Sequence, residues 1–264
     1  MKTLITSVLL LATGSAAAHS SCNLELDAGL RITENSIEFY EATQPTYKIV
    51  EDKYLVVSGQ PLRLNEAQQK LVADYAAGIR AAVPEVRAMA LSGIDLAITG
   101  ITLTFDNLLG EKNQVSTQLA TELNNVKSDV NRYFSAGNPI SINRNGEDIP
   151  DFLDKHFATR IERVVETSVQ NSIGNLMLAM GKEALLAGGD MDAFEERMNK
   201  FGEQIEQQMN ERAAGMAVQS EKFCDTMVDV NALEEQLKRA IPAVESFNLI
   251  RVYTGEVEIV QHSI

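Results

Sequence analysis

The sequence predicts an α+β protein: a small N-terminal antiparallel β-sheet, then an elongated helical bundle or hairpin, then a short C-terminal β-hairpin or strand. Three changes of period predict this order. Apolar residues alternate over 22–64, recur about every fourth position from Asn65, and alternate again after Pro242. A period of two is typical of a half-buried strand and a period near 3.6 of an amphipathic helix. The expected regions are a signal peptide (1–20), a small antiparallel β region (21–64), a helical body (65–242) and a C-terminal β tail (243–264).

The first twenty residues have the three-part layout of a secretory signal peptide. Lys2 precedes an apolar run over 4–12, and small residues follow to Ala18. The run is shorter than the roughly 20 apolar residues that span a bilayer. We therefore expect cleavage after Ala18 or Ser20 and export of a soluble protein to the periplasm of a bacterial-type envelope.

The β region consists of short alternating runs separated by turn residues, which is typical of an antiparallel meander with one covered face. The helical body begins at Asn65, because Asn65 and Gln68 have the spacing of a capping box. Pro84 is expected to end or kink this first helix, or to start the next one. A later helix runs to Phe134 and stops at Gly137.

Two long amphipathic stripes follow, over 150–187 and 190–241, separated by Gly188 and Gly189. This break predicts an antiparallel helical hairpin. Unbroken, the last helix of some fifty residues would extend about 75 Å, so the body is expected to be elongated and coiled-coil-like. The tail after Pro242 is expected to form a β-hairpin, or strands that join the N-terminal sheet.

The charge and composition narrow the classes of partner. The formal net charge is −14 and there is no tryptophan. Such a surface repels phosphate backbones and anionic headgroups, so nucleic acid is excluded as a partner and membrane association is not favoured. The acidity by itself indicates a soluble protein, and the sequence does not indicate an oligomeric state.

Motifs for catalysis, cofactors and metals are missing from the sequence. The three histidines, His19, His156 and His262, accompany no nucleophile motif, and no H-E-x-x-H, C-x-x-C or phosphate-binding loop occurs. An acidic turn over 143–148 lacks the distant glutamate of a calcium loop. We therefore predict no catalytic residue, no cofactor and no metal site. A hydrolase that uses only paired carboxylates leaves no local motif and stays open.

Methionine is the most suggestive residue type. Met198, Met209, Met216 and Met227 lie at intervals of seven and eleven residues, near one face of the last helix. Such spacing is too wide for thioethers to share one copper ion, since seven helical residues rise about 10 Å. The face is interpreted either as core packing or as an adaptable apolar binding face.

The segment 88–105 is the second unusual feature, since Asp95 is its only charged residue. Gly93 and Gly100 belong to a face of small residues that is typical of closely approaching helices. We expect a buried central helix here. The alternative is a membrane-associating segment, which Asp95 disfavours.

Residues 59–68, at the start of the helical body, read GQPLRLNEAQ. This block resembles the YggN-like family of proteobacterial periplasmic proteins of unknown function, and the stretch 182–189 and the pair Cys22 and Cys224 also fit that family. The resemblance implies export and a β-then-helix order, and supplies no activity or ligand. The function expected is that of a non-enzymatic envelope protein binding a protein or apolar partner, with lipid binding through 88–105 and an enzyme as the alternatives.

Cys22 and Cys224 are the only cysteines and both lie in the exported part, where an even count predicts one disulfide. Closing a loop of about 200 residues stabilises the chain by up to about 5 kcal/mol in the chain-entropy model. Peptide mapping of monomer from the periplasm, without reductant, should recover one crosslinked peptide pair. Two alkylatable thiols in the same sample would contradict the pairing.

Overall fold

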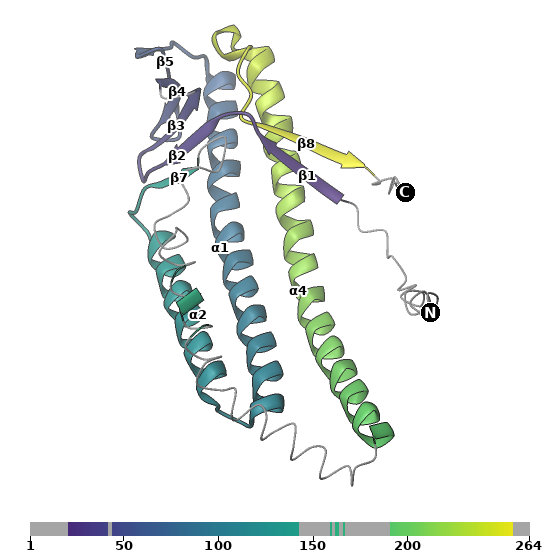
Figure 1. The fold of residues 1–264 in the computed structure, drawn as a ribbon. Coiled ribbons are helices and arrows are strands. Elements are labelled where there is room, and N and C mark those ends of the chain that lie inside the picture. Colours follow the sequence, from purple (N-terminus) through teal and green to yellow (C-terminus); the bar gives the residue numbers. More distant parts are fainter. Residues whose placement is uncertain are drawn as a thin grey trace, which may run out of the picture.

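A computed structural model of the chain describes residues 21–41, 44–142, 159, 162, 163, 166 and 191–255. Within these residues a six-stranded antiparallel sheet lies at one end of three long helices, and a two-stranded ribbon projects beside them (Figure 1). The α+β prediction is therefore confirmed, with its N-terminal sheet, long helices and C-terminal strand. The expected signal peptide (1–20) lies outside the described residues.

The larger sheet has the strand order β6-β5-β4-β3-β2-β7. Its strands are β2 (Gly29–Ile32), β3 (Ser36–Glu41), β4 (Gln44–Val50), β5 (Tyr54–Val57), β6 (Gln60–Pro61) and β7 (Ile140–Ile142). Alternation fixes the covered face, since Ile37 and Phe39 on β3 and Ile49 on β4 are fully buried. β7 extends this sheet from far along the chain by pairing with β2, which the sequence analysis did not predict.

The described part of the C-terminal tail does not join the larger sheet, and the second strand of the expected hairpin lies outside the described residues. Its strand β8 (Ile250–Gly255) pairs antiparallel with β1 (Ser21–Leu26) in a separate two-stranded sheet. The prediction of a tail strand is confirmed. The expected meander over 21–64 is wrong in one respect, because β1 leaves it to pair with β8.

The first long helix, α1 (Glu66–Leu109), begins at the predicted capping box. The Gln68 backbone N–H donates to Asn65 Oδ1 at 2.9 Å, and the Asn65 N–H donates to Gln68 Oε1 at 3.0 Å. The helix continues through Pro84, so neither the predicted end nor the predicted start of a new helix occurs there, and the kink stays a prediction. Pro84 is exposed, and packing of α1 on two other helices offsets the roughly 3 kcal/mol that an interior proline costs.

The other helices are α2 (Gln114–Tyr133), α4 (Met191–Ala240) and the short 3₁₀ helix η2 (Pro242–Val244). The helices α2, α1 and α4 lie side by side as one layer, with α1 in the middle (Figure 1). The described part of the chain has no comparable packing of α2 against α4. The predicted partner of α4, residues 150–187, lies almost wholly outside the described residues.

The seam between α1 and α4 is antiparallel over most of α1. A methyl group at Gly78 would lie 2.9 Å from Val230 Cγ2, one at Gly93 would lie 3.7 Å from Met216 Cε, and one at Gly100 would lie 3.3 Å from Met209 Cε. The residue numbers in each pair sum to 308 or 309, as antiparallel helices require. The predicted close approach at Gly93 and Gly100 is confirmed.

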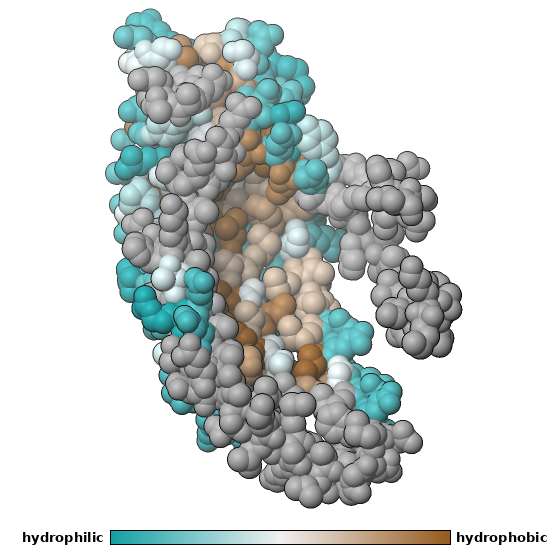
Figure 2. Space-filling model, viewed as in Figure 1, coloured by the Kyte–Doolittle hydropathy of each residue, from teal (hydrophilic) through white to brown (hydrophobic). Residues whose placement is uncertain are grey.

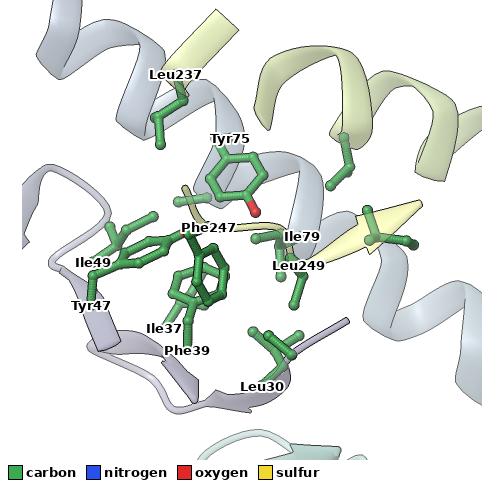
Figure 3. Close-up of a cluster of buried hydrophobic side chains, with 14 of the residues drawn as sticks. Leu30, Ile37, Phe39, Tyr47, Ile49, Tyr75, Ile79, Leu237, Phe247 and Leu249 are labelled. Carbon is green, nitrogen blue, oxygen red and sulfur yellow. The ribbon is translucent and has the colours of Figure 1, made fainter. Parts of the chain in front are cut away.

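The main core lies where α1 and α4 meet the larger sheet. Phe39 and Tyr47 stack with their ring centroids 4.2 Å apart, and Phe247 meets the Tyr47 ring edge-on at 4.6 Å (Figure 3). Tyr75 of α1 stacks on Phe39 at 6.0 Å. Sheet, helix and tail therefore share one aromatic cluster.

Two glycines on the α1–α4 seam provide a matched test of the packing. In Gly78→Ala the new methyl group meets the stiff, fully buried Val230, and overpacking costs about 1–3 kcal/mol. In Gly93→Ala it makes an ordinary contact and gains about 1 kcal/mol of helix propensity. Urea unfolding should show Gly78→Ala less stable than wild type and Gly93→Ala equally or more stable. Equal effects of the two variants would rule out this seam.

Candidate functional site

The candidate site is an apolar surface on the half of the helical layer that lies away from the sheet. We define the shaft surface as residues 88–105 of α1 together with Phe201, Ile205, Met209 and Met216 of α4. Figure 2 shows apolar side chains gathered over α1 and α4 on one face, where the molecule is hollowed. Near the sheet, by contrast, the apolar side chains of the same two helices are in the core.

The α1 part of this surface is central in the layer but is not buried. None of residues 88–105 falls in the buried class, and Ala88 and Ala97 are exposed. The expectation of a buried central helix is therefore wrong, and the described neighbours of α1 along this segment are α2 and α4. By length and composition alone α1 could also cross a membrane.

The predicted methionine face divides between the shaft surface and the core. Met209 and Met216 are half-buried and point at Gly100 and Gly93 of α1. Met227 is 7% exposed in the main core, so it is not available as part of a binding face. The side chain of Met198 lies outside the described residues.

The only charge within residues 88–105 is paired inside the layer. Lys127 Nζ of α2 donates to both Asp95 carboxylate oxygens, at 2.6 and 2.8 Å. The Thr99 hydroxyl donates to the Asp95 backbone carbonyl at 2.9 Å. The remaining side chains of this segment carry no charge, so the shaft surface is electrically neutral along α1.

Acceptor atoms without donors occur beside this surface. Glu85 Oε2 on α1 and Gln219 Oε1 on α4 are buried and have no hydrogen-bond partner among the described residues. The other oxygen of Glu85 forms an ion pair with Lys222 Nζ at 3.2 Å. Both atoms are buried within the seam, and an unpartnered buried acceptor costs about 1–3 kcal/mol.

A buried carboxyl, Glu234 of α4, joins three parts of the fold near the sheet. It is 1% exposed, and its Oε1 accepts from the Tyr75 hydroxyl at 3.1 Å and from the Leu249 N–H at 2.7 Å. The Leu249 carbonyl in turn accepts from the Asp27 N–H at 2.9 Å. This arrangement fastens the tail to α1, α4 and the β1–β2 corner.

Burial is the main cause that raises the pKa of Glu234 above its ordinary value of 4.5, although the Leu249 and Tyr75 hydrogen bonds oppose it. Burial also raises the pKa of Tyr75, and the nearby Glu234 adds to that shift. A group so far from solvent cannot meet a substrate, so we assign it a structural role. The sequence analysis missed it, although its position four residues after Val230 and three before Leu237 places it on the apolar stripe of α4.

The remaining predicted positions are only partly described. Cys22 lies on β1 opposite Thr254, and Cys224 lies half-buried on α4. The side chain of Cys22 is outside the described part, so the disulfide stays a prediction. The turn over 143–148 and the three histidines also lie outside it. Among the described residues no group of three His, Cys, Asp or Glu side chains could hold a metal ion.

Comparison with known proteins gives a family without an assigned activity. Residues 22–250 match the model of a family described as "Protein of unknown function (DUF2884)". No curated protein and no solved structure is similar enough to this chain to count as a match. The match covers the larger sheet, most of β1 and all the described helices, and it ends at Ile250, where β8 begins.

Glu234 should make the stability of the fold depend on pH. Because the folded-state pKa of Glu234 is raised, protonation of this carboxyl stabilises the folded state. The stabilisation is fully present below about pH 4.5 and is lost as pH rises through the folded-state pKa. The variant Glu234→Gln keeps an oxygen acceptor at this position but has no group there that titrates. The melting temperature of this variant should therefore rise relative to that of wild type as the pH increases above about 4.5.

The control is Glu245→Gln, since Glu245 is exposed at the end of η2. Its melting temperature should follow that of wild type at every pH. Parallel profiles for Glu234→Gln and wild type would show that Glu234 is not the titrating group.

Proposed function

This chain belongs to the DUF2884 family of unknown function, and we propose that it is a non-enzymatic envelope protein that binds a protein or an apolar partner through the shaft surface. We further propose that it is exported to the periplasm as a soluble protein and that its relatives include the YggN-like proteins. The single observation that carries the binding role is the incomplete burial of residues 88–105.

Layer packing supports this role. Domains are stable when apolar faces of helices or sheets are buried in at least two packed layers. Near the sheet α1 has such a second layer, and Val72, Tyr75 and Ala76 are fully buried there. Over residues 88–105 the described neighbours of α1 are α2 and α4, in the same layer. Contiguous apolar surface of several hundred Å² usually marks an interaction site.

The chemistry of the shaft surface favours binding over catalysis. It combines neutral apolar side chains with the flexible thioethers of Met209 and Met216, which adapt to partners of different shape. The one buried carboxyl in the main core, Glu234, is fixed by two hydrogen bonds. An enzyme would instead need polar groups converging on an open pocket.

The second candidate is a lipid- or membrane-interacting role for residues 88–105. The length and apolarity of α1 favour it. Three features oppose it: α2 and α4 flank α1, Asp95 is paired with Lys127 in the same layer, and the net charge of −14 repels anionic headgroups. We therefore rank it below binding of a soluble partner.

Export is supported by the signal-like N-terminus and by the position of the cysteines. An oxidising compartment allows Cys22 of β1 and Cys224 of α4 to pair, and no free cysteine occurs among the described residues. A Cys22–Cys224 bond would tie the β1–β8 ribbon to α4, so that the fold matures only after export.

Nile red, a neutral apolar dye, tests the surface directly. The exported chain should bind it with a blue-shifted, brighter emission, and Ala97→Arg should remove most of that signal, because it places a charge at an exposed position of the shaft surface. The matched control is Ala214→Arg, since Ala214 is exposed on α4 and lies about 140° around the helix from Met209.

Equal dye binding by the two arginine variants would argue against the shaft surface as the site. Flotation of wild type with neutral phosphatidylcholine vesicles, lost in Ala97→Arg, would instead support the lipid-binding candidate.

A further inference from the structure

We propose that the C-terminal tail is held by a pH-sensitive latch, which is closed in acid and opens locally as pH rises. We define the tail latch as Glu234 of α4, Tyr75 of α1, Leu249 of the tail and Asp27 at the β1–β2 corner. This inference concerns the attachment of the tail, so it goes beyond the proposed binding role and does not depend on the shaft surface.

The tail latch is a continuous set of hydrogen bonds across four parts of the fold. Glu234 Oε1 accepts from the Tyr75 hydroxyl at 3.1 Å and from the Leu249 N–H at 2.7 Å. The Leu249 carbonyl accepts from the Asp27 N–H at 2.9 Å. Directly after Leu249, β8 begins and pairs with β1 (Figure 1). Glu234 therefore holds the tail at the root of the β1–β8 ribbon.

The tail also covers the carboxyl of Glu234. Leu249 and Ile250 are both buried, and the Leu249 N–H contacts Glu234 Oε1 directly. The second oxygen, Glu234 Oε2, is buried and has no hydrogen-bond partner among the described residues. A buried carboxylate is costly unless its oxygens are hydrogen-bonded. The closed latch therefore disfavours the charged form, and moving the tail aside would let water reach Oε2.

The groups around the carboxyl give the direction of the pH effect. Burial is the largest influence and raises the pKa of Glu234. The hydrogen bonds from Leu249 and Tyr75 and the nearby Lys238 ammonium lower this pKa without cancelling the effect of burial. Protonation of Glu234 therefore stabilises the closed latch.

Other ionisable groups packed against the latch are paired or stay neutral. Burial raises the pKa of Tyr47 on β4 well above its ordinary value of 10, so its hydroxyl stays neutral beside Glu234. Lys238 forms an ion pair with Glu235 at 2.6 Å. The Asp27 carboxylate forms an ion pair with Arg251 of β8.

Linkage between protonation and opening gives the pH window. In the open latch the carboxyl meets water, and its pKa returns towards about 4.5. Closure is therefore fully favoured below about pH 4.5 and weakens as pH rises through the closed-state pKa. Within this window the equilibrium constant for opening should rise about tenfold per pH unit, because one proton is released. The predicted Cys22–Cys224 bond would hold the far end of the ribbon on α4, so the opening is expected to be local.

Amide hydrogen exchange of the full exported chain, followed residue by residue by NMR, tests the latch. Protection factors correct for the intrinsic pH dependence of exchange. The Leu249 and Asp27 amides should be less protected than the amides of β3 and β4, and low concentrations of urea should not change their exchange, since a local opening exposes little surface. Their protection should fall as pH rises above about 4.5.

Two variants at the latch and one control assign the effect. Glu234→Gln should make the protection of Leu249 nearly independent of pH, whereas Glu245→Gln should keep the wild-type profile. Tyr75→Phe removes a hydrogen bond that favours the carboxylate, so it should raise the closed-state pKa further. The loss of protection at Leu249 should then continue to higher pH than in wild type. A hydroxyl with only a packing role would shift the protection equally at every pH.

Two results would overturn the latch. One is a Leu249 profile in Glu234→Gln that runs parallel to that of wild type. The other is a Leu249 amide with the same protection and the same urea dependence as the amides of β3 and β4, because the tail would then open only when the whole protein unfolds.

Discussion

The antiparallel packing of α1 on α4 is the interaction on which the rest of the fold depends. It brings together two segments more than a hundred residues apart in the chain, and its closest point is Gly78 against Val230. A side chain at Gly78 would push the helices apart where the aromatic cluster of the sheet packs against them. The larger sheet, the tail and α2 are all positioned relative to this pair of helices.

Near the sheet, the same packing brings a carboxyl into the core. Glu234 sits where α1, α4 and the tail converge, and the Tyr75 hydroxyl and Leu249 N–H satisfy one of its oxygens. Burying a carboxyl costs free energy unless hydrogen bonds offset the lost hydration. Its position is specific, because the tail must reach α4 with the Leu249 N–H directed at that oxygen. The direction of the tail in turn lets β8 pair with β1.

Away from the sheet, the described residues form no second layer over the helices. There α1 has α2 on one side and α4 on the other, and residues 88–105 keep apolar surface accessible between them. Asp95, the only charged residue of that segment, pairs with Lys127, and both side chains remain partly exposed. Among the described residues, the chain therefore has a well-covered core at one end and a partly exposed apolar face at the other.

The sequence by itself determined the local elements. The capping box at Asn65, the change of period there and the face containing Gly93 and Gly100 all depend on contacts within a few residues along one helix, which periodicity records. Only the tertiary structure decided which elements pair and pack together. It placed β7 beside β2, β8 beside β1, carried α1 through Pro84, and left residues 88–105 accessible. An apolar stripe shows which face of a helix tends to be buried. Which segment buries that face depends on residues far apart in the chain, and no local period encodes that choice.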